Sequence, residues 1–87
     1  MMSLAEVDAV VHTVESHWSH PVMTAAGFVP VWLEASGLVR SFEYEHPSGH
    51  RIRASTGVNA DHWQDLTTGA IGYWSSLRKH VEELDLG

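Results

Sequence analysis

Apolar residues recur at three- and four-residue spacing near the start of the chain. Five of them fall on one face of a helix: Leu4, Val7, Val11, Val14 and Trp18. Ser3 and Glu6 have the spacing of a capping box, in which the two side chains satisfy exposed backbone amides at a helix start. The pattern therefore predicts a helix that begins at Ser3 and extends to about His17.

The hydrophobic pattern changes after this helix. Pro21 lacks an amide hydrogen, so we expect a break and a short second helical segment through Ala26, ended by Gly27. From Phe28 to Ala35 the pattern alternates, which predicts a strand. One face would carry Val29, Val31, Leu33 and Ala35, and the other Phe28, Pro30, Trp32 and Glu34. Pro30 cannot donate to a ladder, so this strand should lie at a sheet edge.

The segment from Ser41 to Ser55 reads as a β-hairpin. Pro47-Ser48-Gly49 suits a three-residue turn, because proline presets one backbone angle and glycine accepts a left-handed conformation. Counting back from His46 opposite His50 gives the pairs Glu45/Arg51, Tyr44/Ile52, Glu43/Arg53 and Phe42/Ala54. One face of the hairpin is then apolar, and opposite charges pair across the other.

The last third of the chain predicts a helix. After Gly57, turn residues and a weak helical segment over 60–66 precede an amphipathic stripe formed by Ile71, Trp74, Leu77, Val81 and Leu84. The expected order is α-β-β-β-α, an α+β fold in which a three-stranded antiparallel meander is packed on one face by two helices. No linker or repeat divides residues 1–87, which predicts a single domain.

Length and charge narrow the classes of partner. With 87 residues the core is small, which favours self-association as a way to cover apolar surface. The formal charge of −6 opposes binding to nucleic acid or to anionic membranes and fits a cationic protein partner better. The chain has no cysteine and no apolar run long enough to span a bilayer. We therefore expect a cytoplasmic protein without a membrane segment.

Short motifs resemble one known family. Gly27-Phe28, His46-Pro47-Ser48-Gly49 and Leu77-Arg78, in the predicted element order, resemble the HicA-type mRNA-interferase toxins, which have a double-stranded-RNA-binding-like fold. The resemblance covers most of the chain and implies RNA binding or cleavage. The family's catalytic histidine would fall on Ser41 or Leu38, and neither is a histidine. Serine is a poor general base near neutral pH, so the resemblance supports the fold more than the activity.

Seven histidines are the other candidates for chemistry. His46 and His50 should meet across the hairpin turn, where they would clip a metal, repel each other at acid pH, or simply flank the turn. His17 and His20 are three residues apart, but Pro21 disturbs a shared helical face. The sequence contains no nucleophile elbow, phosphate loop or His-Glu-x-x-His motif. The absence of these motifs favours a non-catalytic protein without a cofactor.

Trp32 is the candidate for an interface. By parity it lies on the outer face of an edge strand, near the Glu43/Arg53 pair, as an exposed aromatic residue typical of interface anchors. A register slip of one residue would instead bury it. The predicted surface consists of Phe28, Trp32, Arg40 and Arg53. We expect a binding module that acts through its sheet face and its edge strand, and that self-associates or contacts a protein partner. A HicA-like RNA-binding or degenerate RNA-cleaving protein is the alternative.

Overall fold

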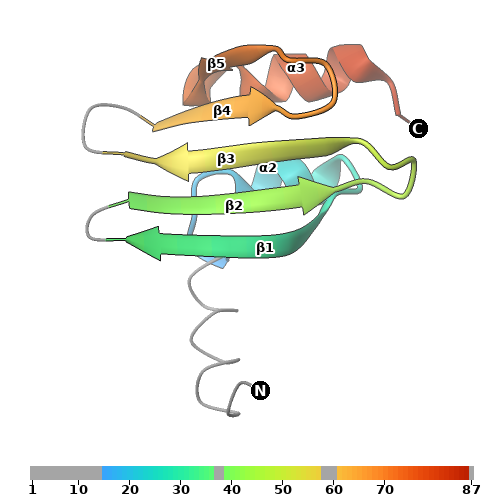
Figure 1. Ribbon diagram of the computed structural model, residues 1–87. Helices are drawn as coiled ribbons and strands as arrows, with labels where there is room; N and C mark the ends of the chain where they lie inside the picture. Colours follow the sequence, from blue (N-terminus) through green and yellow to red (C-terminus); the bar gives the residue numbers. More distant parts are fainter. Residues whose placement is uncertain (1–14, 37–38, 58–60, 87) are drawn as a thin grey trace.

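The computed structural model describes residues 15–36, 39–57 and 61–86. These ranges contain α2 (His20–Ala25), β1 (Val29–Ser36), β2 (Val39–Glu45), β3 (Arg51–Thr56), β4 (Asp61–Asp65), β5 (Ile71–Tyr73), the 3₁₀-helix η1 (Trp74–Ser76) and α3 (Leu77–Leu84). The strands form one antiparallel sheet in the order β1-β2-β3-β4-β5 (Figure 1). The fold is therefore α+β as predicted, but its sheet has five strands rather than three.

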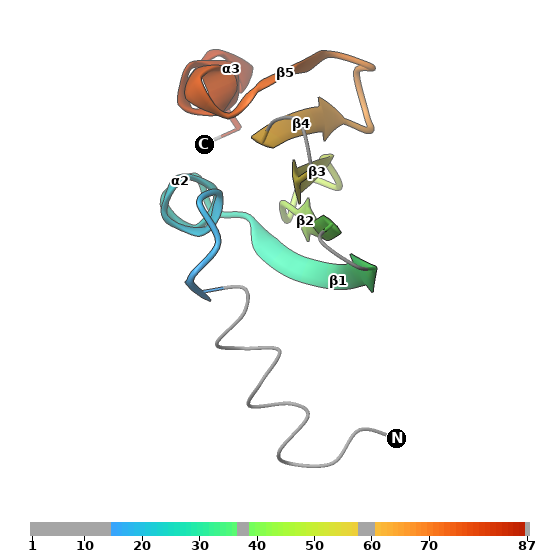
Figure 2. The same cartoon turned by 90° about the vertical axis from the view of Figure 1, so that its left-hand side faces the viewer.

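Both described helices lie on the same side of the sheet. Figure 2 shows the sheet nearly edge-on, with α2 beside its β1 end and α3 beside its β5 end. No described helix or strand covers the opposite side, which we call the outer face. No helix in the described ranges is long and apolar enough to cross a membrane.

The hairpin of β2 and β3 has the predicted register. Its pairs are Glu45/Arg51, Tyr44/Ile52, Glu43/Arg53 and Phe42/Ala54. The His46 amide donates to the His50 carbonyl at 2.9 Å, and Gly49 takes a φ of 94°, as the turn requires. The proline, the glycine and the side-chain alternation all specify the same hairpin, which is why sequence reasoning succeeded here.

β1 departs from a simple alternation. It is an edge strand, as Pro30 predicted, but its pairing with β2 shifts between Pro30 and Trp32. Such an irregularity reverses the faces of the residues before it. Leu33 packs on the core and Trp32 is exposed, both as expected, whereas Phe28 is buried at 2% exposure and Val29 is exposed. The assignment of Phe28 to the outer face was therefore wrong.

The segments on either side of the β4–β5 turn also differ from the prediction. Residues 61–65 form β4 instead of a helical turn, and residues 71–73 form β5 instead of the first turn of the last helix. Side chains of β4 do alternate between the two faces of the sheet, and the inward ones are Trp63 and Asp65. A charged residue at an inward position hides the alternation of apolar and polar residues that would identify a strand. Trp74, expected in the core, is 59% exposed, whereas Leu77 and Val81 are buried.

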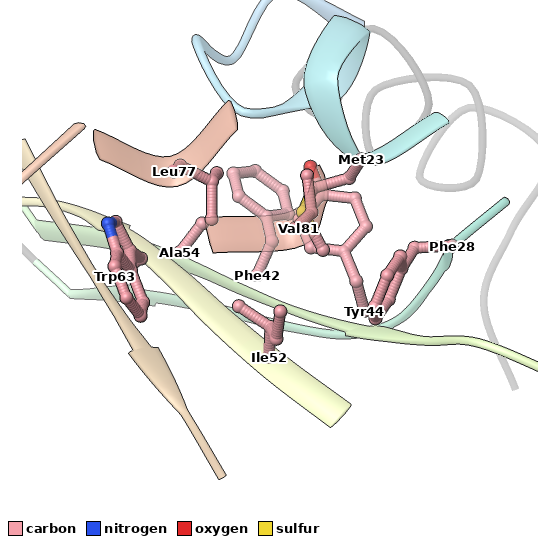
Figure 3. Packing of buried hydrophobic residues seen from close by; sticks show 9 residues of the cluster. All are labelled: Met23, Phe28, Phe42, Tyr44, Ile52, Ala54, Trp63, Leu77 and Val81. Atoms are coloured by element: carbon pink, nitrogen blue, oxygen red, sulfur yellow. The ribbon is translucent and has the colours of Figure 1, made fainter. Parts of the chain in front are cut away.

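The core lies between the helices and the inner face of the sheet. Its buried residues come from α2, the α2–β1 connection, the sheet and α3 (Figure 3): Met23, Phe28, Phe42, Tyr44, Ile52, Ala54, Trp63, Leu77 and Val81. Trp18 packs against this cluster, in agreement with its predicted role. The short helix ends as expected, with Ala26 at its C-cap and Gly27 at a φ of 88°. The predicted helix from Ser3 lies almost entirely outside the described residues.

Trp63 sets a steric limit on β5. A Cβ atom on Gly72 would lie 2.6 Å from the Cζ2 atom of Trp63 and from the Oγ atom of Ser76. Gly72→Ala should therefore lower the free energy of unfolding by about 1–3 kcal/mol, the usual cost of overpacking, as measured by urea denaturation. Ser75→Ala, at an exposed position nearby, is the control and should change little. Equal stability of the two variants would contradict this packing.

Candidate functional site

A row of side chains crosses the outer face from one edge of the sheet to the other. Successive strand pairings place these residues side by side: Trp32, Glu43, Arg53, Gln64 and Ile71. The two ends of the row are apolar and exposed, since Trp32 is 41% and Ile71 75% accessible. Its centre is polar. The outer face thus has two apolar edges, separated by a strip of charged and amide side chains.

Contacts with the hairpin hold Trp32 in place. The guanidinium carbon of Arg53 lies 4.9 Å from the centroid of the Trp32 ring, within the range of a cation–π contact. Arg53 also pairs with Glu43 at 3.5 Å, and its Nε atom is buried without a hydrogen-bond partner. The ring is therefore exposed to solvent but restrained by its neighbours.

The structure divides the predicted surface. Trp32 and Arg53 are in contact, but Phe28 belongs to the core. Arg40 pairs with Thr56 and lies two residues before the inward-facing Phe42, so strand alternation places it on the inner side of the sheet. Val29 and Val31, which the alternation had assigned to the core side, are 56% and 44% exposed. We call Val29, Val31 and Trp32 the β1 patch.

His46 and His50 are backbone partners, as predicted, but their side chains have separate contacts. The Nδ1 atom of His46 accepts a hydrogen bond from the Ser48 amide at 3.1 Å and lies 2.9 Å from the Ser48 hydroxyl. The Nε2 atom of His50 lies 2.6 Å from the Oδ2 atom of Asp65. Within the described residues, no group of three or more metal-ligating side chains could hold a metal ion. Each ring therefore has a separate structural contact.

Asp65 is the centre of a buried cluster that sequence reasoning missed. Its side chain is fully buried at the end of β4, where Oδ2 accepts from Nε2 of His50 at 2.6 Å and of His80 at 2.7 Å. Oδ1 accepts from the backbone amides of Thr67 and Thr68, both at 2.9 Å. Because a carboxylate only accepts hydrogen bonds, both imidazoles must donate. The cluster joins the start of β3, the β4–β5 turn and α3.

These contacts decide the ionisation state of Asp65. Burial by itself would raise the pKa of the carboxyl, but the hydrogen bonds from His50, His80, Thr68 and Thr67 together outweigh burial and hold its pKa well below the usual range. Since the folded-state pKa is depressed, Asp65 contributes stability above about pH 4, and this contribution is lost on further acidification. The His80 ring also stacks on Trp63, with their centroids 4.3 Å apart.

A second polar network lies under the first strands. His17 contacts Ser19 through Nδ1 and Thr56 through Nε2, each at 2.7 Å, and Ser19 contacts the Tyr44 hydroxyl at 2.8 Å. Burial lowers the pKa of His17 to about 4, against the opposing attraction of Asp61. The ring is therefore neutral at pH 7. It links the segment before α2 to β3.

The hollows on the described surface include three that lie away from the Asp65 cluster. One of about 310 Å³ separates α2 from α3 and is lined by residues that include Val22, Phe28 and Val81. A second, of about 420 Å³, lies on β4 and β5 beside His62, Ile71 and Tyr73, and a third, of about 250 Å³, adjoins the hairpin turn. None of these hollows is lined by His50, Asp65 or His80. The Asp65 side chain is fully buried, and its hydrogen bonds link the hairpin, the β4–β5 turn and α3.

Comparisons with known proteins supply no relative. No family model, curated protein or solved structure matches this chain. The resemblance to HicA-type toxins is neither supported nor contradicted by these searches. Ser41, one of the two positions aligned with the family's histidine, is buried, and its hydroxyl lies 2.8 Å from that of Ser55. Any functional assignment must therefore rest on the surface of this molecule.

The Asp65 cluster can be tested with an isosteric change. Asp65→Asn replaces one accepting oxygen by an amide donor, which opposes the two donating imidazoles. We expect the free energy of unfolding to fall by about 2–3 kcal/mol, the range for a hydrogen-bonded buried charge. Asp85→Asn, at an exposed C-cap, makes the same chemical change and should cost little. If both variants unfold at the same urea concentration, the cluster does not hold the fold together.

His17 should make folding sensitive to mild acid. Its pKa is about 4 in the folded chain against an ordinary value of 6.5, so the unfolded chain binds more protons between these values. The free energy of unfolding should fall by up to about 3 kcal/mol as the pH drops from 6.5 to 4. His17→Gln should remove most of that slope in urea titrations, whereas His62→Gln, at an exposed histidine, should retain it. Parallel slopes in all three proteins would contradict this assignment.

Proposed function

We propose that this protein is a non-catalytic binding module that contacts a protein partner through the β1 patch and the adjoining outer face. The observation that carries the proposal is the exposure of Val29, Val31 and Trp32 on an edge strand of a sheet whose outer face is not covered by any described helix or strand. Exposed apolar residues grouped in this way, beside charged neighbours, are typical of interaction surfaces. Isolated exposed apolar residues would not have the same meaning.

Trp32 is the anchor of the proposed surface. An aromatic side chain contributes binding free energy most effectively when water is excluded around it and when little conformational freedom is lost on binding. The contact with Arg53 restrains the ring before a partner arrives, and Glu43 in turn holds Arg53. A partner that covers Trp32 would also shield this ion pair from solvent and strengthen it.

The binding mode is inferred from the irregular strand edge. Pro30 has no amide hydrogen, and the register shift before Trp32 interrupts the ladder, so a continuous added strand would fit poorly on this half of β1. Side chains should therefore provide most of the contact. Glu34 and Glu45 adjoin the patch and the chain is acidic, so we expect a partner that offers apolar and cationic groups.

The direct test compares two exposed tryptophans. A photo-crosslinking amino acid at Val31 should capture a partner in extract from the source cells, and Trp32→Ala should abolish that capture because the anchor is lost. Trp74→Ala removes the same side chain from a 59% exposed position outside the patch and should retain the cross-link. Mass spectrometry of the cross-linked product identifies the partner.

Two results would contradict the proposal. Capture that is unchanged by Trp32→Ala would show that the patch is not the binding surface. Cross-linking to RNA, with binding that weakens as salt is raised, would instead favour the RNA-binding alternative.

A further inference from the structure

The two edges of the sheet differ in their protection against strand pairing. β1 carries a proline and a register shift, both of which discourage pairing with another chain. β5, with the sequence Ile71-Gly72-Tyr73, has no proline, charge or irregularity, and no described strand pairs with its outer side. Figure 1 shows β5 at the end of the sheet opposite β1. β5 is therefore the unprotected edge.

The ladder of β4 and β5 shows which backbone groups face outward. The Asp65 amide donates to the Ala70 carbonyl at 2.7 Å, so Asp65 and Ala70 form a hydrogen-bonded pair. Alternation along an antiparallel ladder then directs the groups of Gly72 toward β4 and those of Ile71 and Tyr73 toward the free edge. The Tyr73 carbonyl already accepts from Trp63 and Ser76, which leaves both groups of Ile71 and the Tyr73 amide for another strand.

We propose that a second copy of this chain pairs with β5 in antiparallel fashion, about a two-fold axis through Gly72. In this register Ile71 of each copy lies opposite Tyr73 of the other, and the two Gly72 residues face each other. The Tyr73 amide of each copy donates to the Ile71 carbonyl of the other copy. Two main-chain hydrogen bonds thus form even though the Tyr73 carbonyl is occupied.

Side-chain complementarity points to a second copy as the occupant. Ile71 and Tyr73 are 75% and 68% exposed, and each would cover the other across the axis in an aliphatic–aromatic pair. Residues 66–77 contain no charged side chain, so two chains of charge −6 can meet there without opposing charges of the same sign. Symmetric dimers of this kind are the commonest homo-oligomers.

Cysteine cross-linking tests the register directly, because the chain has no cysteine of its own. Ile71→Cys mixed with Tyr73→Cys should form a disulfide-linked dimer under mild oxidation, since opposite residues lie within disulfide range. Either variant alone should remain uncross-linked, because identical positions are two residues out of register and exceed the roughly 7 Å limit. Efficient cross-linking of a single variant alone would overturn the proposed axis.

Sedimentation velocity over a concentration series tests the association itself. The wild-type chain should show a monomer–dimer equilibrium, and Ile71→Lys should weaken it by at least about tenfold. Val31→Lys, an equivalent change on the β1 edge, should leave it intact, as should Trp32→Ala. A wild-type monomer at every concentration, or a dimer that Ile71→Lys does not affect, would overturn the proposal. Because the proposed partner surface is on β1, either proposal can fail while the other stands.

Discussion

The buried carboxylate of Asp65 is the interaction on which the described architecture depends. All four of its acceptor positions are used, two by imidazoles and two by backbone amides. A buried charge is tolerated only when it is satisfied in this way. Through these contacts one side chain links the hairpin and the β4–β5 turn to α3, which it reaches through His80.

The position of α3 determines which surface remains for function. α2 and α3 both lie on the inner side of the sheet (Figure 2), and the core forms there. The outer face carries the charged pair Glu43/Arg53 between its two apolar edges. The edges differ in chemistry: β1 presents Trp32 with an interrupted backbone, whereas β5 presents free backbone groups beside Ile71 and Tyr73. Pairing through β5 would place the outer faces of two copies side by side, with a β1 patch at each far edge.

Sequence reasoning succeeded where several local signals agreed. The hairpin had a turn, an alternation and charge pairs that specified one register, and all three were correct. Sequence reasoning failed where a tertiary interaction overrides the local pattern. The irregularity in β1 buries Phe28, and the inward position of Asp65 makes sense only once His50 and His80 are adjacent, although they are 30 residues apart. Simple alternation along β1 did predict the outer position of Trp32, because the register shift lies on the N-terminal side of this residue.

Native mass spectrometry of the untreated protein from its source cells tests the binding role most directly, because one spectrum reports every bound mass. We expect the chain to carry the mass of another protein, and Trp32→Ala to remove that mass. A chain that carries only a metal ion or a small molecule, or no added mass at all, would contradict a protein-binding role for the β1 patch.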